Sequence, residues 1–277
     1  MLCACATLLW FSQVGHRFRL LSGTSAGLGV LFAVAAAVLW RQQRRHPHPF
    51  LPLEVLRLPG MAWICLSVIG FAGTMFALLF LLPIYLQAGH GADAFDSGLQ
   101  LLPLTLGLVV GSFLNGRVSV RTGRSGMLPP WGLAIAALAL LSLAVLPATG
   151  WSIGIAMAIC GIGFGSVMPN AQIGAQLLAG PERLGASASL LSLSRSTGAS
   201  LGTAAFGGLA FLLLQPSGPR GRAAGLRLDR IDAELIAQSF DLVFCALALF
   251  AGLTALAASR APVFELHEPG WRQQLHK

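Results

Sequence analysis

Charged residues are scarce in this chain of 277 residues: only 10% are Asp, Glu, Lys or Arg, whereas 55% are hydrophobic. The mean hydropathy is +0.74. An average soluble domain has roughly 25% charged residues, and so few charges cannot cover a water-exposed surface. The apolar side chains must therefore face lipid. This composition excludes a soluble enzyme, a disordered chain and a nucleic-acid binder, and it predicts an integral membrane protein.

Long apolar runs take the place of the missing charges. Seven of them are long enough to cross a bilayer as helices, which requires about 20 residues. They are Ser22–Trp40, Met61–Gln87, Gly98–Asn115, Met127–Ala148, Trp151–Leu178, Gly185–Leu214 and Gln238–Ser259. The runs are continuously apolar, whereas strands of a membrane barrel alternate in polarity over about 10 residues, so helices are favoured. Met1–Ser12 is too short to span and has no basic residues before its apolar part, so we interpret it as the stub of a truncated helix.

Titratable side chains are missing from the centres of these runs. All ten acidic residues lie in loops or at helix ends, with Asp241 at the edge of the last run, and the six His lie outside the runs. Proton-coupled transport needs a titratable group at membrane depth, so the chain has no evident proton site of its own. No His, Asp, Glu or Cys cluster suits a metal or a catalytic centre. We therefore expect no cofactor, no metal site and no enzyme activity.

Lysine is nearly absent: 17 of the 18 basic residues are Arg. Loops on one side of the predicted spans carry eleven Lys or Arg, and loops on the other side carry six. Because cytoplasmic loops carry the excess, the C-terminus is predicted to be cytoplasmic and Met1 to lie outside, in a cell membrane of the bacterial inner-membrane type. An outer N-terminus without an export signal favours a missing upstream segment. The eleven are Arg41, Arg44, Arg45, Arg57, Arg117, Arg121, Arg124, Arg183, Arg260, Arg272 and Lys277.

Arg195 is the one basic residue inside a run. If its helix begins near Gly185, the residue lies about 15 Å deep. An unpaired Arg at the bilayer centre costs about 2.5–3.5 kcal/mol, so Arg195 is expected to face a cavity or a partner helix. The alternative is a later helix start, which would let Arg195 reach the cytoplasmic surface. The hydroxyl residues that make this stretch unusually polar are Ser192, Ser194, Ser196 and Thr197.

Glycine pairs at four-residue spacing predict helices that pack closely in lipid. We interpret these pairs as packing faces, and a second interpretation is that the same faces slide during a transport cycle. The pairs are Gly107 and Gly111, Gly161 and Gly165, and Gly198 and Gly202.

Prolines mark two further candidate sites. Pro83 precedes Tyr85 and Gln87 at the outer end of a run, where a kink would open the helix and present polar groups; an ordinary kink with a boundary Tyr is the alternative. Pro169 precedes Asn170 near the cytoplasmic end, which is consistent with a gate or cavity lining, or with a simple helix end.

Four segments, in order and at matching spacing, carry a resemblance over nearly the whole chain: His46–Leu53, Leu82–Gln87, Ser97–Pro103 and Arg195–Gly202. They resemble the linker and the first, second and fifth helices of the C-terminal half of a major facilitator superfamily transporter, of the fourteen-helix drug–proton antiporter type that performs multidrug efflux. The resemblance implies two six-helix bundles with a hydrophobic small-molecule substrate between them near the midplane.

This resemblance implies an all-α integral membrane protein of about seven transmembrane helices. Residues 1–21 would form the helix stub and an outer loop, 22–60 a linker helix and cytoplasmic loop, 61–259 the six-helix C-terminal bundle, and 260–277 a cytoplasmic tail. The implied function is all or part of a proton-coupled multidrug or small-molecule efflux permease, with a missing N-terminal transporter half as partner. The alternative is a truncated, non-transporting remnant, or a half-transporter that needs a separate N-terminal half.

One motif of the family is degenerate. Residues 116–124 resemble the family's signature cytoplasmic loop, but Val120 stands where the signature has Asp. Without the acid, we expect Gly116, Arg117, Arg121, Gly123 and Arg124 to serve topology and helix-end contacts more than a charge-paired switch. The candidates for a substrate cavity or for helix pairing are Pro83, Tyr85, Gln87, Asn170, Arg195, Gly198 and Gly202.

Overall fold

The computed structural model describes residues 53–145, 150–214 and 233–265. Several predictions lie outside these residues. They concern the linker helix Ser22–Trp40, the stub Met1–Ser12 and residues 266–277 of the cytoplasmic tail. The described helices are α3 (Leu53–Leu56), α4 (Met61–His90), α5 (Ala94–Leu99), α6 (Leu102–Thr122), α7 (Leu128–Val145), α8 (Gly150–Gly165), α9 (Val167–Ala179), the 3₁₀ turn η1 (Pro181–Arg183), α10 (Leu184–Leu213) and α11 (Ala233–Ser259). Two short strands, β1 (Arg124–Ser125) and β2 (Phe264–Glu265), complete them.

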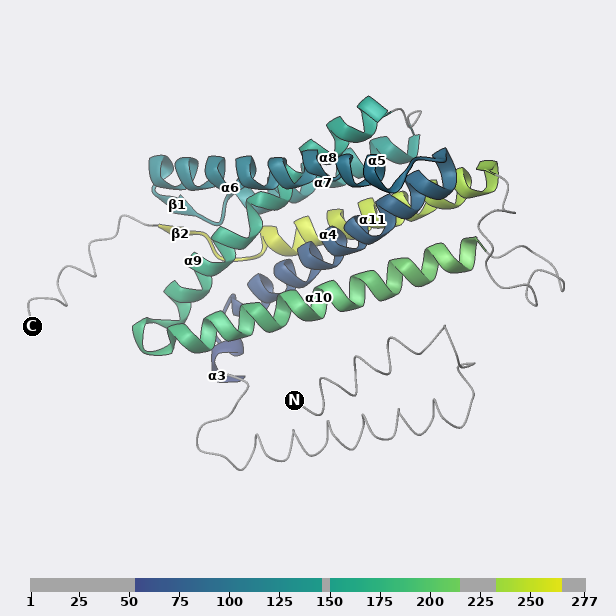
Figure 1. Ribbon diagram of the computed structural model, residues 1–277. Coiled ribbons are helices and arrows are strands. Elements are labelled where there is room, and N and C mark those ends of the chain that lie inside the picture. The colour runs from purple at the N-terminus through teal and green to yellow at the C-terminus, as the bar shows by residue number, and fades with distance from the viewer. Residues whose placement is uncertain (1–52, 146–149, 215–232, 266–277) are drawn as a thin grey trace, which may run out of the picture. The chain divides into compact units, whose positions relative to one another are not determined.

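Six helical segments are long and apolar enough to cross a membrane, and they confirm the predicted all-α membrane fold. Their bounds are Met61–Gly89, Ala94–Thr122, Leu128–Val145, Gly150–Ala179, Pro181–Leu213 and Ser239–Ser259. In Figure 1 the long helices run alongside one another, joined at the two ends of the bundle.

Some helix boundaries differ from the apolar runs. The second span begins as the short α5, restarts at Leu102 with Pro103 at a helix-starting position, and continues to Thr122, past the predicted end at Asn115. The fourth span breaks at Ser166 between α8 and α9. α11 begins at Ala233, five residues before the predicted start at Gln238. The helix-forming residues Ala233–Ala237 extend it beyond the apolar run. Asp241 therefore lies in the third turn of α11, but it remains at the edge of the apolar span Ser239–Ser259.

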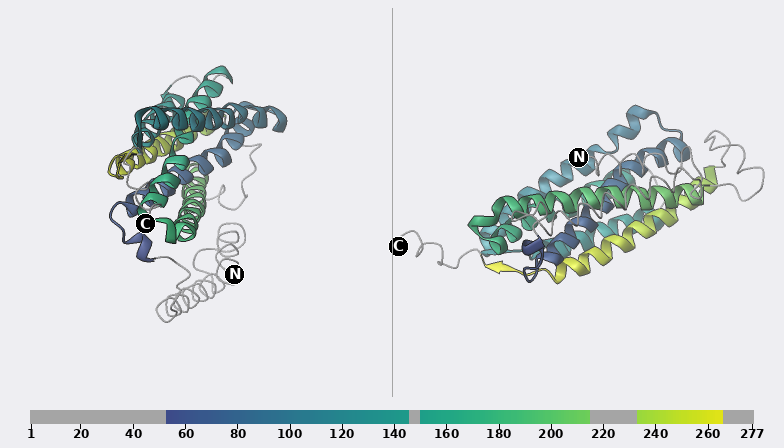
Figure 2. Two further views of the ribbon diagram at one scale, coloured as in Figure 1. Left: turned by 90° about the vertical axis from the view of Figure 1, so that its left-hand side faces the viewer. Right: turned by 90° about the horizontal axis from the view of Figure 1, so that it is seen from below.

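The six spans form two connected groups. α4 packs against α10 and α11, while α7 packs against α8 and α11, and α6 packs against α8. Figures 1 and 2 show α6 and α10 on opposite sides of the bundle, with α4 between them. In the most apolar 18-residue stretch of α4, 72% of the residues are buried. In the corresponding stretches of the spans that contain α6 and α10, only 22% are buried. The helices α6 and α10 therefore keep wide faces open.

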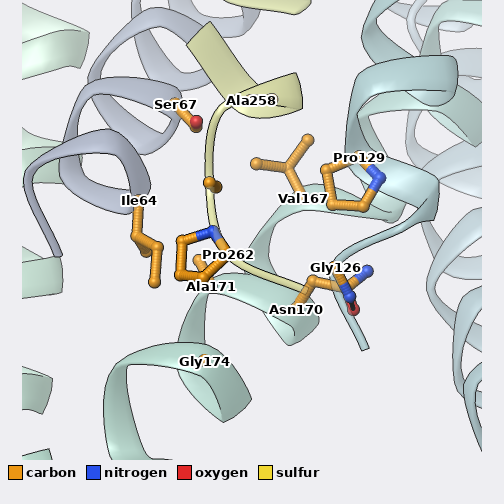
Figure 3. A pocket seen from close by; sticks show the side chains of 11 residues that line it. Ile64, Ser67, Gly126, Pro129, Val167, Asn170, Ala171, Gly174, Ala258 and Pro262 are labelled. Atoms are coloured by element: carbon orange, nitrogen blue, oxygen red, sulfur yellow. Dashed lines mark hydrogen bonds between the residues drawn. The ribbon is translucent and has the colours of Figure 1, made fainter. Parts of the chain in front are cut away.

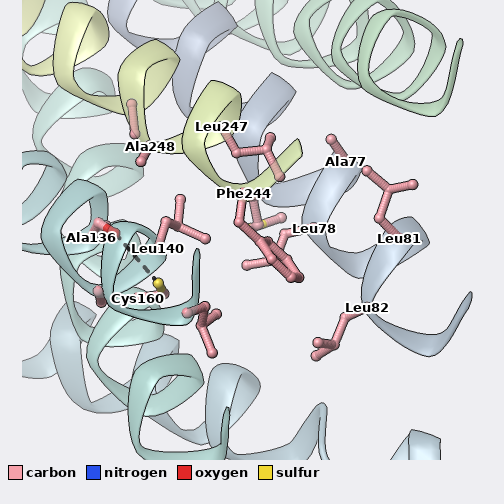
Figure 4. Packing of buried hydrophobic residues seen from close by; sticks show 14 of the residues in the cluster. Ala77, Leu78, Leu81, Leu82, Ala136, Leu140, Cys160, Phe244, Leu247 and Ala248 are labelled. Carbon is pink, nitrogen blue, oxygen red and sulfur yellow. Dashed lines mark hydrogen bonds between the residues drawn. The ribbon is translucent and has the colours of Figure 1, made fainter. Parts of the chain in front are cut away.

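The core lies where α4, α7, α8 and α11 meet. Leu78 and Leu82 of α4 pack with Leu140 of α7 and Phe244 of α11 (Figure 4). The Cys160 thiol on α8 lies 3.6 Å from the carbonyl oxygen of Ala136 on α7, and the two residues are drawn together in Figure 4. Buried apolar side chains thus join the two groups of helices into one bundle.

Glycine faces bring pairs of helices close together. A Cβ atom placed on Gly161 of α8 would lie 3.0 Å from the Cα of Gly107 on α6. A Cβ on Gly198 of α10 would lie 2.7 Å from the Cα of Ile69 on α4, and one on Gly202 would collide with the backbone of Gly73. Since these contacts leave no room for a side chain, the four-residue spacing acts here through direct backbone approach.

Candidate functional site

Arg195 lies on an exposed side of α10. The helix begins at Leu184, so Arg195 is eleven residues, or about 16 Å, from its start. The alternative of a later helix start is therefore wrong. The side chain is exposed in the bundle, and its guanidinium carbon lies 5.9 Å from the ring centre of Phe76 on α4. This distance is within the range of a cation–π contact.

A stripe of serine side chains follows the exposed side of α10. Ser189, Ser192, Ser196 and Ser200 are spaced by three and four residues, so they share one face, and all four are exposed. Polar side chains in a bilayer face protein or a water-filled cavity more often than lipid. This hydroxyl stripe therefore indicates that protein or water covers the exposed side of α10.

A strip of α4 residues begins at Phe76, the residue that contacts Arg195. Phe76, Phe80, Pro83 and Gln87 follow helical spacing, and each is exposed or half-buried. The strip is apolar from Phe76 to Pro83 and ends in the exposed amide of Gln87. Together with Arg195 and the hydroxyl stripe it forms a surface with one cation, several hydroxyls and aromatic rings, which we call the open face.

The structure separates Tyr85 from this surface. α4 continues as one helix through Pro83 to His90, so the helix does not open at the proline. Tyr85 is only 3% exposed, and its ring packs 5.1 Å from that of Phe240 on α11. The prediction that Tyr85 presents a polar group at the outer interface is wrong, because its position on the helix turns it toward α11.

Gly198 and Gly202 also lie away from the open face, against α4 as described above. Of the residues named as cavity or pairing candidates, Arg195, Pro83 and Gln87 share the open face, whereas the two glycines lie in a helix contact. Phe76 and Phe80 were missed by sequence reasoning, because a Phe in an apolar run carries no signal of which way it faces.

A second polar group lies at the arginine-rich end of the bundle, around Asn170 of α9. Its side-chain oxygen accepts hydrogen bonds from the Ser125 hydroxyl at 2.9 Å and from the Gly126 backbone amide at 3.0 Å. Its side-chain nitrogen donates to Asn115 of α6 and, at 2.9 Å, to the Ser166 carbonyl. Asn170 is 5% exposed, so it links α6, β1 and the α8–α9 break from a buried position.

A small cavity of about 30 Å³ adjoins this polar group, as Figure 3 shows. Gly126, Val167 and Asn170 line one side, and Ile64 and Pro262 line the other. This volume is the size of about one water molecule, too small for an organic substrate. The cavity therefore belongs to the packing of this end and is not a substrate site.

The chain after α11 forms a strap across the same end. β2 pairs antiparallel with β1, with Arg124 opposite Glu265 and Ser125 opposite Phe264. Pro262 packs against Gly60, which has a positive φ of 91°. The guanidinium carbon of Arg260 lies 5.6 Å from the Trp63 ring centre. The sequence of this tail does not predict the pairing, because the partner strand lies about 140 residues away.

The residues resembling a signature loop are mostly helical. Gly116, Arg117 and Arg121 lie on the last turns of α6, all exposed, and Gly123 ends the helix in the left-handed region at φ 66°. Arg124 lies in β1. The expected loop is thus only a short turn after Thr122.

Basic residues mark the end that carries the strap. Of the seven Arg in the described residues, six lie at this end and Arg195 lies within a span. Arg183 and Glu54 form an exposed ion pair at 3.4 Å, which contributes little to stability because both groups are solvated. The six are Arg57, Arg117, Arg121, Arg124, Arg183 and Arg260.

Comparison with known proteins gives consistent matches. A sequence profile of the Major Facilitator Superfamily matches residues 1–203. A Methylenomycin A resistance protein of Streptomyces coelicolor is 30% identical over 211 residues, covering 72% of this chain and 44% of that protein. An uncharacterized transporter of Escherichia coli is 34% identical over 211 residues, which cover 75% of this chain and 45% of that protein. A Tetracenomycin C resistance and export protein of Streptomyces glaucescens is 33% identical, with coverages of 65% and 35%. The match thus spans less than half the length of each relative.

A solved structure shares the fold. The bacterial homologue of the human lysosomal transporter Spinster, in an inward-facing and occupied conformation, superposes with a TM-score of 0.58 and 20% sequence identity. The superposition covers 94% of this chain and 65% of that one.

Proposed function

The chain belongs to the Major Facilitator Superfamily, a family of transporters and not of enzymes, and from this premise we propose that it is all or part of a small-molecule efflux permease. The observation that carries the proposal is the similarity to relatives named for antibiotic resistance and export. Multidrug efflux driven by protons is the activity that we propose within this class.

We propose that the open face is one wall of the substrate cavity. In support, it combines an apolar strip on α4 with the exposed Arg195 and a hydroxyl stripe on α10. A hydrophobic substrate would lie along Phe76 and Phe80, and Gln87 would border the outer entrance.

A first helix bundle would supply the opposite wall. The relatives are more than twice as long as the segment that matches, and α6 and α10 leave wide faces open. We propose that these faces contact a first bundle, carried either by the same polypeptide or by a separate chain. We also propose that the proton-binding carboxylate lies in that bundle, because the acidic residues of the six described spans, Asp96, Glu182 and Asp241, all lie within the first three residues of a span.

The orientation proposed for the bundle is that of a bacterial cell membrane protein with a cytoplasmic C-terminus. It is supported by the six Arg gathered at the end where α11 leaves the bundle, since positive residues concentrate on the cytoplasmic side.

A chimera tests the function. The part of the Escherichia coli relative that precedes its matched segment is fused to residues 54–277, and the chimera is produced in cells lacking their main efflux pumps. We expect lower accumulation of a fluorescent drug than in cells with an empty vector, and loss of the difference when a protonophore removes the proton gradient. The natural chain, assayed beside it, reports whether it transports alone.

A chimera that reaches the membrane in normal amount but leaves accumulation unchanged would contradict the proposal. It would favour the alternative of a non-transporting remnant. Transport by the chimera and not by the natural chain would instead indicate a half-transporter that needs a separate first bundle.

A further inference from the structure

We propose that Arg195 and the hydroxyls beside it bind the negative group of an organic anion whose apolar body lies along Phe76 and Phe80. This inference rests on the proposed function and names its substrate class. The described contacts give Arg195 an aromatic neighbour on α4 and no acidic one, whereas the ion pair of Arg183 with Glu54 lies at the end of the bundle.

The charge balance of the open face selects an anion. None of α4, α6 and α10 contains an Asp or Glu, so these three helices offer a cationic substrate no counter-charge. Arg195 contributes a permanent positive charge there, because the guanidinium group stays protonated in proteins. In a medium of low dielectric constant, this charge attracts an anion and repels a cation more strongly than it would in water.

The position of the guanidinium group supports a binding role. A helical side chain leans toward the N-terminal end of its helix, which for α10 is the arginine-rich end, so Arg195 could reach water by extending that way. Its guanidinium group instead lies over Phe76, which is 15 residues from the start of α4 and 14 from its end. Phe76 lies about 22 Å from one end of α4 and about 21 Å from the other, and the charge is held beside its ring.

The surroundings match an amphiphilic ligand. A guanidinium group can donate two parallel hydrogen bonds to a carboxylate or sulfonate. Ser192, three residues before Arg195, is an exposed hydroxyl donor on the same side of α10. Phe76 is half-buried and Phe80 is 49% exposed, which leaves ring surface for an apolar body. A small inorganic anion would leave that ring surface unused.

Two probes that differ by one charged group test the inference. Anilinonaphthalene sulfonate is an aromatic anion, and N-phenylnaphthylamine is the same ring system without the sulfonate. Both fluoresce more strongly in apolar sites, and binding is titrated with the full chain in lipid nanodiscs, after subtraction of empty nanodiscs. We expect Arg195→Gln to weaken sulfonate binding by about tenfold to a hundredfold, the range of a charge-assisted hydrogen bond. Binding of the neutral probe should change less than about twofold, because it makes no such bond.

Two variants serve as controls. Arg183→Gln removes the same charge from the surface end of the same helical segment and should leave the affinity for the sulfonate unchanged. Arg195→Lys keeps the charge but lacks the planar guanidinium group that donates two parallel hydrogen bonds. Its affinity for the sulfonate should therefore lie between those of the natural chain and Arg195→Gln. Retained binding of the neutral probe shows that each variant is folded.

Equal affinity of the sulfonate for the natural chain and for Arg195→Gln overturns the inference. So does saturable binding of the neutral probe alone, a result that leaves the efflux proposal standing. If neither probe binds above empty nanodiscs, the open face is no cavity wall in this chain, and both proposals fail together.

Discussion

At the residue scale, Asn170 shows how an amide side chain is accommodated in a bundle whose interior is mostly apolar. Its amide group makes four hydrogen bonds to α6, β1 and the α8–α9 break. An unpaired buried polar group costs about 1–3 kcal/mol. Asn170 therefore stabilises this end of the bundle by satisfying partners that would otherwise be unpaired.

We expect Asn170→Ala to lower the free energy of unfolding by about 3 kcal/mol, because it leaves several buried groups unpaired. Asn115→Ala is the matched control. It removes one hydrogen bond together with a side-chain nitrogen that has no partner among the described residues, so it should cost less. Thermal unfolding of the detergent-solubilised protein measures both. Equal losses in the two variants would show that the Asn170 hydrogen bonds contribute little.

At the scale of elements, close helix pairs depend on glycine. Gly73 and Gly202 bring α4 and α10 into backbone contact, and Gly107 and Gly161 do the same for α6 and α8. In lipid no hydrophobic effect draws helices together, so close packing has to supply the attraction. These two contacts hold the open helices α6 and α10 to the rest of the bundle.

Gly202→Ala should destabilise the bundle by about 1–3 kcal/mol, the usual cost of overpacking. Gly208→Ala on the same helix is the matched control, since a Cβ there meets nothing within 4 Å. It should be neutral, or stabilise by up to about 1 kcal/mol through the higher helix propensity of Ala. Both are measured as shifts in the melting temperature in detergent. A melting temperature that falls equally in both variants would contradict a specific contact at Gly202.

At the scale of the whole molecule, the two ends of the bundle differ in charge and in connection. One end carries six Arg and the strap, which links the chain after α11 to β1 and to Gly60 before α4. Asn170 of α9 bonds to the same β1 segment. The described part of the other end carries Asp93 and Asp96 and no Lys or Arg. This asymmetry is the physical basis of the proposed orientation.

Cysteine labelling tests that orientation. In a variant without the five native Cys, Asp93→Cys and Arg183→Cys are introduced singly and treated with a membrane-impermeant maleimide. We expect Asp93→Cys to react in intact cells or spheroplasts, and Arg183→Cys to react only in inverted vesicles, because positive ends stay in the cytoplasm. The reverse pattern would show that the bundle is inserted the other way.

The apolar runs were sufficient to predict the six spans that the structure describes, and four short segments were sufficient to indicate the family. The reason is that a backbone in lipid must satisfy its hydrogen bonds within each segment, so length and composition alone decide which segments become helices. Arg195 was recognised in the same way, as a charge that lipid does not tolerate.

Only the tertiary structure decided which way each helix faces. Lipid and protein core are both apolar, so the sequence cannot distinguish them, and Tyr85 turned out buried while Gln87, two residues on, is exposed. The partners of Asn170 lie 55 residues away on α6 and 45 residues away at β1. The strap joins strands about 140 residues apart. Such contacts leave no local pattern, because they form only when distant segments meet at one end of the bundle.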